Sequence, residues 1–348
     1  MEASPSMFLE EIAMKAKQIV GIVITGIVII AVGVTGVLSN VLESQFAAEQ
    51  TSFLDTLWNE EMEEGIVLPE EDFVGVIDVV GEIGPSSYSD LYYTESTYNH
   101  SLYMEYIDMM MYADNNKGIM LYVDSPGGTV YESDELYLKL MEYKEVTGRP
   151  VWAYFASEAC SGGYYIAMAA DRIYANRNCW TGSIGVVISL MNVQGLYEKL
   201  GIEEIDITSG ANKAMGAAGA ELTQEQYDIL QSLVDEAYDQ FVGIVAEGRA
   251  MDEATVRALA DGRIYSAKQA LETDLIDAIG SYEEEVAAFI SEEDLAEDIT
   301  FYAPEAEVSD IMSLFYYAAE KITPKSDTEL ATDIIENNGN GVLKYYAE

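Results

Sequence analysis

Strand-like and helix-like segments alternate through the middle of this chain, and this alternation is the strongest constraint on its fold. Short apolar runs typical of buried strands lie at 73–83, 118–123, 151–155 and 172–175, and helical patterns lie at 132–143 and 164–170. Chains with this pattern build β-α-β units, in which helices cover a largely parallel sheet. The sequence therefore predicts an α/β fold from about residue 73 to residue 280.

The clearest helix is predicted to begin at Thr223, because Thr223 and Gln226 have the spacing of a capping box. Apolar side chains then recur at helical spacing, at Leu230, Leu233, Val234, Ala237, Tyr238, Phe241, Val242 and Val245. A stripe of this kind is ordinary core or a contact between subunits, and nothing in it indicates a cofactor site.

An uncharged apolar run precedes the alternating region, from Gln18 to Leu42. Its length is enough to cross a bilayer core of about 30 Å as a helix. A cleaved signal peptide is the alternative, but the run is longer than a typical signal h-region and no Ala-x-Ala site follows it. Lys15 and Lys17 precede the run and acidic residues follow it, so the positive-inside rule places residues 1–17 in the cytoplasm and the body of the chain outside.

The charge balance of the 348 residues excludes one class of partner. There are 62 acidic and 17 basic residues, which give a formal net charge of −45. A surface with this charge repels phosphate backbones, so we expect no nucleic-acid partner. A single histidine and two cysteines without metal-ligand spacing argue against a zinc cluster, and we expect neither a metal nor a cofactor.

Two glycine-containing segments follow predicted strands and carry candidate chemistry. Gly127 and Gly128 close the run Asp-Ser-Pro-Gly-Gly, where backbone N–H groups can point into a cleft and form an oxyanion hole. Ser161 and Gly162 begin a predicted helix, a position that suits a plain N-cap and also a nucleophile beside the positive end of the helix dipole. Both segments also have ordinary structural explanations, a common turn and a helix cap.

A third segment, residues 209–220, holds a single charged side chain, Lys213, among small and mostly apolar neighbours. It is either a flexible loop with an incidental lysine or the site of a desolvated amine, which could accept a proton from a serine hydroxyl. A Ser-His-Asp triad would have to use His100, which lies in the polar, tyrosine-rich stretch 92–103 and is expected in a loop or an exposed connection. Lysine is therefore the better candidate base. We expect Cys160 to be a small packed side chain rather than the nucleophile.

Five motifs in order resemble those of the signal peptide peptidase A (protease IV-like) family of serine–lysine peptidases. They are Asp124-Ser-Pro-Gly-Gly128, Ser161-Gly-Gly-Tyr-Tyr-Ile-Ala167, Thr181-Gly-Ser-Ile-Gly-Val186, the Gly-x-x-Lys turn at 210–213 and Gly262-Arg-Ile-Tyr265. The resemblance runs from about residue 73 to residue 285 and is to the short, single-copy, membrane-anchored type. The departures are Asp124 where many relatives have Asn, Cys160 where a small Ala is usual, and Ala214 where an acidic residue is frequent.

The resemblance implies a crotonase/Clp-like fold of ββα units, and a Ser161 nucleophile with Lys213 as general base. It also implies oxyanion amides from Gly128 and Gly162, and a Ser183 hydroxyl that orients the lysine. The family degrades remnant signal peptides and other apolar peptides at the membrane, needs no metal or nucleotide, and forms rings or bowls in which neighbouring subunits complete one another's sites.

We therefore expect five regions along the chain. These are a cytoplasmic N-terminus (1–17), one transmembrane helix in contact with lipid (18–42), an acidic connector (43–72), a peptidase domain on the outer face of the cell membrane (73–290) and an acidic C-terminal extension (291–348). Two other hypotheses remain at this point, a crotonase-type acyl-CoA enzyme and a catalytically silent membrane scaffold. The first shares a glycine-rich oxyanion hole but needs neither Lys213 nor a membrane span.

Overall fold

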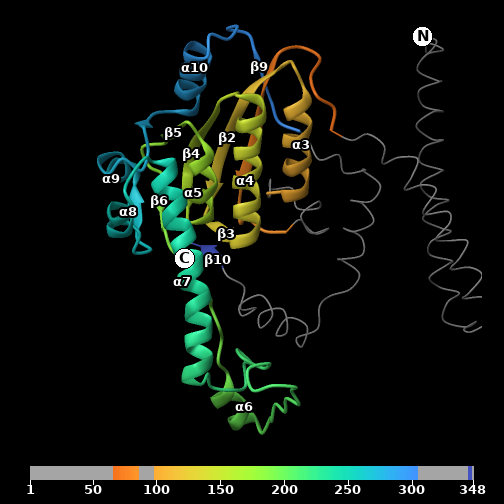
Figure 1. The fold of residues 1–348 in the computed structure, drawn as a ribbon, viewed down its shortest axis with the longest axis vertical. Helices are drawn as coiled ribbons and strands as arrows, with labels where there is room; N and C mark the ends of the chain where they lie inside the picture. Colours follow the sequence, from red (N-terminus) through yellow and green to blue (C-terminus); the bar gives the residue numbers. More distant parts are fainter. Residues whose placement is uncertain (1–65, 86–97, 305–343, 347–348) are drawn as a thin grey trace, which may run out of the picture. The chain divides into compact units, whose positions relative to one another are not determined.

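The computed structural model describes residues 66–85, 98–304 and 344–346. Within these ranges, a parallel-rich sheet is covered by helices on both faces (Figure 1). The chain divides into two compact units between Gly65 and Ile66, and the described residues belong to the second. The expected transmembrane run at 18–42 and most of the connector lie outside the described residues. None of the helices in the described ranges has the length and hydrophobicity to span a membrane.

The main sheet has eight strands in the described part of the chain, and its backbone order is β7-β6-β4-β2-β1-β9. The strands are β1 (Phe73–Val80), β2 (Asn116–Ser125), β4 (Val151–Cys160), β5 (Arg172–Ala175), β6 (Trp180–Gly182), β7 (Ile264–Ser266), β8 (Ala278–Ile279) and β9 (Thr300–Tyr302). The central three strands are parallel neighbours and are largely buried, as their apolar runs predict.

Helices lie on the two faces of this sheet. They are α3 (His100–Tyr112), α4 (Val130–Thr147), α5 (Gly162–Ile166), α7 (Gln224–Gly248), α8 (Glu253–Leu259), α9 (Ala267–Glu272) and α10 (Tyr282–Glu292), while α6 (Gln194–Leu200) lies away from the sheet (Figure 1). The α3, α4 and α5 helices and the buried part of α7 share the larger apolar core with one face. On the other face, Phe289 of α10 packs against Trp152 of β4 in a smaller core. The α/β prediction is confirmed at this level.

Strand β4 changes neighbour along its length. Its first half, Trp152–Phe155, pairs with β5, and its last three residues, Glu158–Cys160, pair with β6. The sheet therefore forks near Ala156, and Ser161 follows directly at the end of the β6 branch. Sequence patterning predicted only the first half of β4, since residues 156–160 are small or polar and their pairing depends on the tertiary fork.

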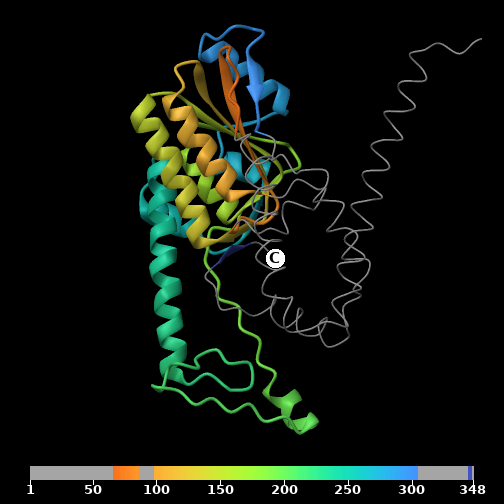
Figure 2. The same ribbon diagram turned by 90° about the vertical axis from the view of Figure 1, so that its right-hand side faces the viewer.

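Helix α7 carries an arm away from the sheet. Its predicted capping box at Thr223 and Gln226 is present. The apolar stripe divides into two parts, because Phe241, Val242 and Val245 are buried while Leu233 is 42% exposed. Figures 1 and 2 show α6 and the segment after it at the far end of α7. The stripe is thus core in its C-terminal half and free surface in its N-terminal half.

Two observations depart from the sequence-based expectations. The expectation of an exposed connection at His100 is wrong: His100 begins α3, and its side chain is 7% exposed. The apolar residues Tyr103, Tyr106, Ile107 and Met110 lie at helical spacing and bury one face of α3. Beyond residue 290, β9 pairs with β1 in the main sheet, so the sheet continues into the region expected as an acidic extension.

Candidate active site

Ser161 occupies a strained turn between β4 and α5. Its φ is 54° although it is not a glycine, a conformation that costs a side chain roughly 1–3 kcal/mol. Its N–H donates to Gly182 O at 2.7 Å. The side chain is 0% exposed, and within the described part of the chain its Oγ has no hydrogen-bond partner. A strained backbone combined with a buried hydroxyl that makes no structural hydrogen bond is typical of a positioned nucleophile.

Gly128 and Gly162 lie against each other beside Ser161. Gly128 belongs to the short strand β3 (Gly127–Thr129), and Gly162 begins α5. A Cβ on Gly162 would lie 2.5 Å from Ser133 Oγ and 3.1 Å from Gly128 N. A Cβ on Gly128 would lie 1.8 Å from Ile83 O. Both positions therefore require glycine, and the two predicted oxyanion residues are brought together.

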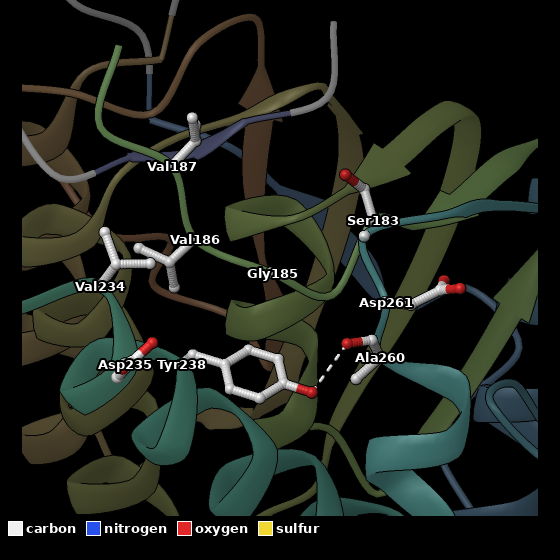
Figure 3. A pocket seen from close by; sticks show the side chains of 10 residues that line it. Ser183, Gly185, Val186, Val187, Val234, Asp235, Tyr238, Ala260 and Asp261 are labelled. Carbon is white, nitrogen blue, oxygen red and sulfur yellow. Dashed lines mark hydrogen bonds between the residues drawn. The ribbon is translucent and has the colours of Figure 1, made fainter. Parts of the chain in front are cut away.

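Ser183 lies on the other side of the Ser161 backbone. It follows Gly182, which accepts the Ser161 N–H, and its own N–H donates to Arg263 O at 2.8 Å. Its φ is 48° and it is 6% exposed. Ser183 also lines a cavity of about 340 Å³ between β6 and α7 (Figure 3). Tyr238 of α7 closes part of that cavity, and its hydroxyl donates to Ala260 O at 2.8 Å.

Lys213 is not brought to this site within one chain. Its loop is fixed to the start of α7, where Gln226 Nε2 donates to Ala211 O at 3.3 Å and Asn212 Nδ2 donates to Glu225 at 3.2 Å. At the other end of α7, Phe241 packs on Tyr165 of α5, with ring centroids 5.0 Å apart. The fifteen residues between Gln226 and Phe241 span roughly 22 Å of helix at 1.5 Å per residue. The Lys213 side chain is exposed, so its own chain does not provide the desolvation expected for a general base.

A strand near the C-terminus lies along this site. Strand β10 (Lys344–Tyr346) pairs antiparallel with β3, with Tyr345 opposite Gly128, and it also contacts α4 and α5. Sequence reasoning missed this strand. The signal available was the pair Tyr345-Tyr346 after a long acidic stretch, since aromatic residues favour strands. The β3 edge beside Ser161 therefore accepts an extended peptide backbone.

The alternative nucleophile, Cys160, and the alternative base, His100, both have structural roles. Cys160 is buried, and burial raises the pKa of its thiol to about 12, so it is a protonated packing group at neutral pH. Tyr98 Oη lies 2.5 Å from Nδ1 of His100, and Glu135 lies 2.8 Å from Nε2. Both ring nitrogens of the histidine are thus held in the α3–α4 interface. In the ranges described, no three His, Cys, Asp or Glu side chains are grouped to hold a metal.

Comparison with known proteins agrees with this geometry. Residues 144–296 match the model of peptidase family S49, a range that includes Ser161, Ser183 and Lys213. The chain is 39% identical over 221 residues to a putative signal peptide peptidase SppA of Enterococcus faecium, which is 64% of each chain. It is 43% identical over 166 residues to a putative protease of Synechocystis, covering 48% of this chain and 59% of that protein.

Protease 4 of Haemophilus influenzae is 34% identical over 174 residues, which cover 50% of this chain and 28% of the relative. The chain therefore spans less than two thirds of the length of each of these relatives. The matched region, the five ordered motifs and the convergence of Ser161, Gly162 and Gly128 all point the same way: over residues 144–296 the chain matches peptidase family S49.

Proposed function

We propose that this protein is a serine endopeptidase in which Ser161 is the nucleophile and Lys213 of a neighbouring copy is the general base. The observation that carries the proposal is the pairing of an extended strand, β10, with β3 at Gly128, next to the strained Ser161. A cleft that pairs with an extended backbone presents a peptide carbonyl to whatever nucleophile lies beside it.

The chemistry would proceed in two steps. The neutral Lys213 amine accepts the Oγ proton as Ser161 attacks the peptide carbonyl, and the Gly128 and Gly162 N–H groups hold the oxyanion. The lysine then gives its proton to the departing amine, which leaves an acyl-enzyme. Water hydrolyses this ester by the same route. Ser183 would orient the lysine, and the support for this role is that Ser183 adjoins Gly182, which accepts the Ser161 N–H.

A second copy of the chain would complete this site. In one chain, the length of α7 separates Lys213 from Ser161, while the arm exposes a set of apolar side chains: Leu196 (53%), Leu200 (64%), Ile202 (51%), Ile205 (73%) and Ile207 (97%). Apolar surface of this extent on a projecting element is typical of a subunit contact. A ring or bowl of copies would bury this surface and bring each Lys213 to the next subunit's Ser161.

The substrates that fit the proposal are remnant signal peptides and other apolar peptides at the membrane. The relative in Enterococcus faecium is named as a putative signal peptide peptidase. The apolar run at 18–42 would anchor the protein as one transmembrane helix, with residues 1–17 cytoplasmic and the catalytic domain on the outer face. The parallel-rich sheet with its β3–α5 glycine contact supports a crotonase/Clp-like fold.

The test is cleavage of an apolar signal-peptide fragment by the full-length protein and three variants. Ser161→Ala and Lys213→Ala should each abolish cleavage, and Lys199→Ala, which removes another exposed lysine of the arm, should not. Mixing the two inactive variants should restore part of the activity, because an assembly that contains both offers some sites with an intact serine and an intact lysine. Full activity in either single variant would refute the dyad, and inactive mixed assemblies would refute its sharing between copies.

A further inference from the structure

A second cavity, of about 600 Å³, lies at the carboxyl ends of β2 and β5, beside the fork in the middle of β4 and next to the first turn of α10. Carboxyl ends of parallel strands are where open α/β sheets usually bind ligands. This cavity shares no lining residue with the Ser183 cavity.

Three tyrosines form one wall of this cavity. Tyr122 of β2, Tyr154 of β4 and Tyr282 of α10 are in mutual contact, with ring centroids 5.8 Å (Tyr122–Tyr154), 5.5 Å (Tyr122–Tyr282) and 5.4 Å (Tyr154–Tyr282) apart. Two of the contacts are edge-to-face, at 88° and 61°. The faces of aromatic rings attract cations.

Carboxylates form the rest of the electrostatic environment. Asp124 and Glu283 line the cavity, and no lysine or arginine does. Arg177, on the turn that joins two lining residues, is exposed and forms no ion pair with the described residues. Glu285, one helical turn beyond Tyr282, is fully buried, and burial raises its pKa to about 9, so it is uncharged at neutral pH. Asp124 and Glu283 are therefore the charged side chains that line the cavity. Burial, together with the nearby carboxylate of Asp78, raises the pKa of Tyr122 and Tyr282.

On the same face of the sheet, another cation, the guanidinium of Arg172, already lies against an aromatic ring and a carboxylate. The Arg172 guanidinium of β5 lies 5.0 Å from the centroid of the Trp152 ring and pairs with Glu292 of α10. Trp152 lies two residues before Tyr154 on β4, and the same helix that offers Glu292 at its end offers Glu283 at its start. The cavity thus combines aromatic rings with carboxylates, as the Arg172 site does, but no arginine of the described residues lines it.

We propose that this cavity binds the guanidinium or ammonium group of an arginine or lysine side chain in the peptide substrate. The identity of the ligand as part of a substrate rests on the proposed peptidase function. A signal peptide carries such side chains in its basic segment, before its apolar core.

The experiment measures binding rather than cleavage, so that it stands apart from the catalytic proposal. Full-length Ser161→Ala protein is titrated with an amidated peptide of two arginines followed by an apolar segment, and with the same peptide in which citrulline replaces arginine. Citrulline keeps the shape and removes the charge. We expect the arginine peptide to bind about tenfold more tightly, an effect of the size of one desolvated cation–π and charge contact.

In the same background, the pair Asp124→Asn and Glu283→Gln should abolish this preference. The control pair, Glu297→Gln and Asp298→Asn, removes two exposed carboxylates that do not line the cavity and should leave the preference intact. Equal binding of the two peptides would overturn the proposal. Equal loss in the control pair would also overturn it, because the preference would then come from the overall charge. If the arginine preference is found but the wild-type protein cleaves no apolar peptide, only the catalytic proposal is refuted.

Discussion

At the scale of single residues, the site depends on backbone positions that tolerate no ordinary substitution. Ser161 has a positive φ, and Gly162 and Gly128 approach each other within the space that a Cβ would fill. The geometry of the site thus depends on the close contact between two backbone segments, β3 and the start of α5. In the proposed mechanism Ser161 contributes the nucleophile, and the glycines allow the two backbone amides to converge.

Gly162→Ala tests this convergence. The new Cβ would meet Ser133 Oγ and the Gly128 amide, so β3 and α5 must separate and the oxyanion donors move. Loss of one such donor typically costs about 100–1,000-fold in rate. We expect a fall in kcat of that size together with a lower thermal midpoint, because overpacking a buried contact also destabilises the fold. Gly243→Ala is the matched control, because a Cβ on Gly243 of α7 has no atom within 4 Å. A Gly162→Ala enzyme with full kcat would contradict the assignment.

Glu285 makes a separate prediction about stability and pH. Burial raises its folded pKa to about 9, whereas an exposed glutamate titrates near 4.5. Between these values the folded state holds a proton that the unfolded state releases, so this group lowers the free energy of unfolding by about 1.4 kcal/mol for each pH unit of increase. Glu285→Gln should remove that dependence. The thermal midpoint of the variant, measured relative to that of the wild type, should therefore increase as the pH rises from 5 to 8. Glu297→Gln, at an exposed position, should show no such trend.

At the scale of elements, the strands and helices that owe their position to local pattern were predictable. The apolar runs placed β1, β2 and β5, and the capping box placed the start of α7. The second half of β4 and the pairing of β9 and β10 were not predictable, because each depends on neighbours distant in sequence. The helix that begins at His100 has apolar residues at helical spacing, so its local pattern was available and was missed. Likewise, the motifs indicated Ser161, Gly162, Gly128 and Ser183, which the fold gathers. They could not show that Lys213 lies at the other end of α7.

The arm built on α7 yields a prediction about assembly. Replacing Leu200 and Ile207 by serine removes two of its most exposed apolar side chains, which are 64% and 97% exposed. We expect dissociation of the assembly and at least a tenfold loss of peptidase activity, with helix content unchanged in circular dichroism. Light scattering in detergent measures the mass of the complex. Tyr112→Ser, at an 83% exposed position on α3, should alter neither mass nor activity.

At the scale of the whole molecule, the net charge of −45 opposes the association of identical copies. Such repulsion is screened over about 10 Å at 0.1 M salt and over about 3 Å at 1 M. An enzyme whose site is shared between copies should therefore become more active as salt brings the copies together.

We expect the concentration at half-assembly to fall at least tenfold between 20 mM and 500 mM sodium chloride, with activity at low protein concentration rising in parallel. Sedimentation across a dilution series measures the assembly. Sucrose at the same osmolality is the control, because it does not screen charge. Assembly that weakens with added salt would indicate that ion pairs, rather than the apolar arm, hold the copies together.

The fork in β4 has one more consequence, which concerns length. Tyr154 lies on the β5 branch and Ser161 follows the β6 branch, and the seven residue steps from one to the other span roughly 23 Å of strand. A rigid strand with the proposed cation site at Tyr154 and the proposed nucleophile at Ser161 holds these two points at a fixed distance from each other. Peptides that use both points need about six or seven extended residues between the basic side chain and the bond that is cut. Moving the arginine along a substrate of fixed length should then move the preferred cleavage position with it.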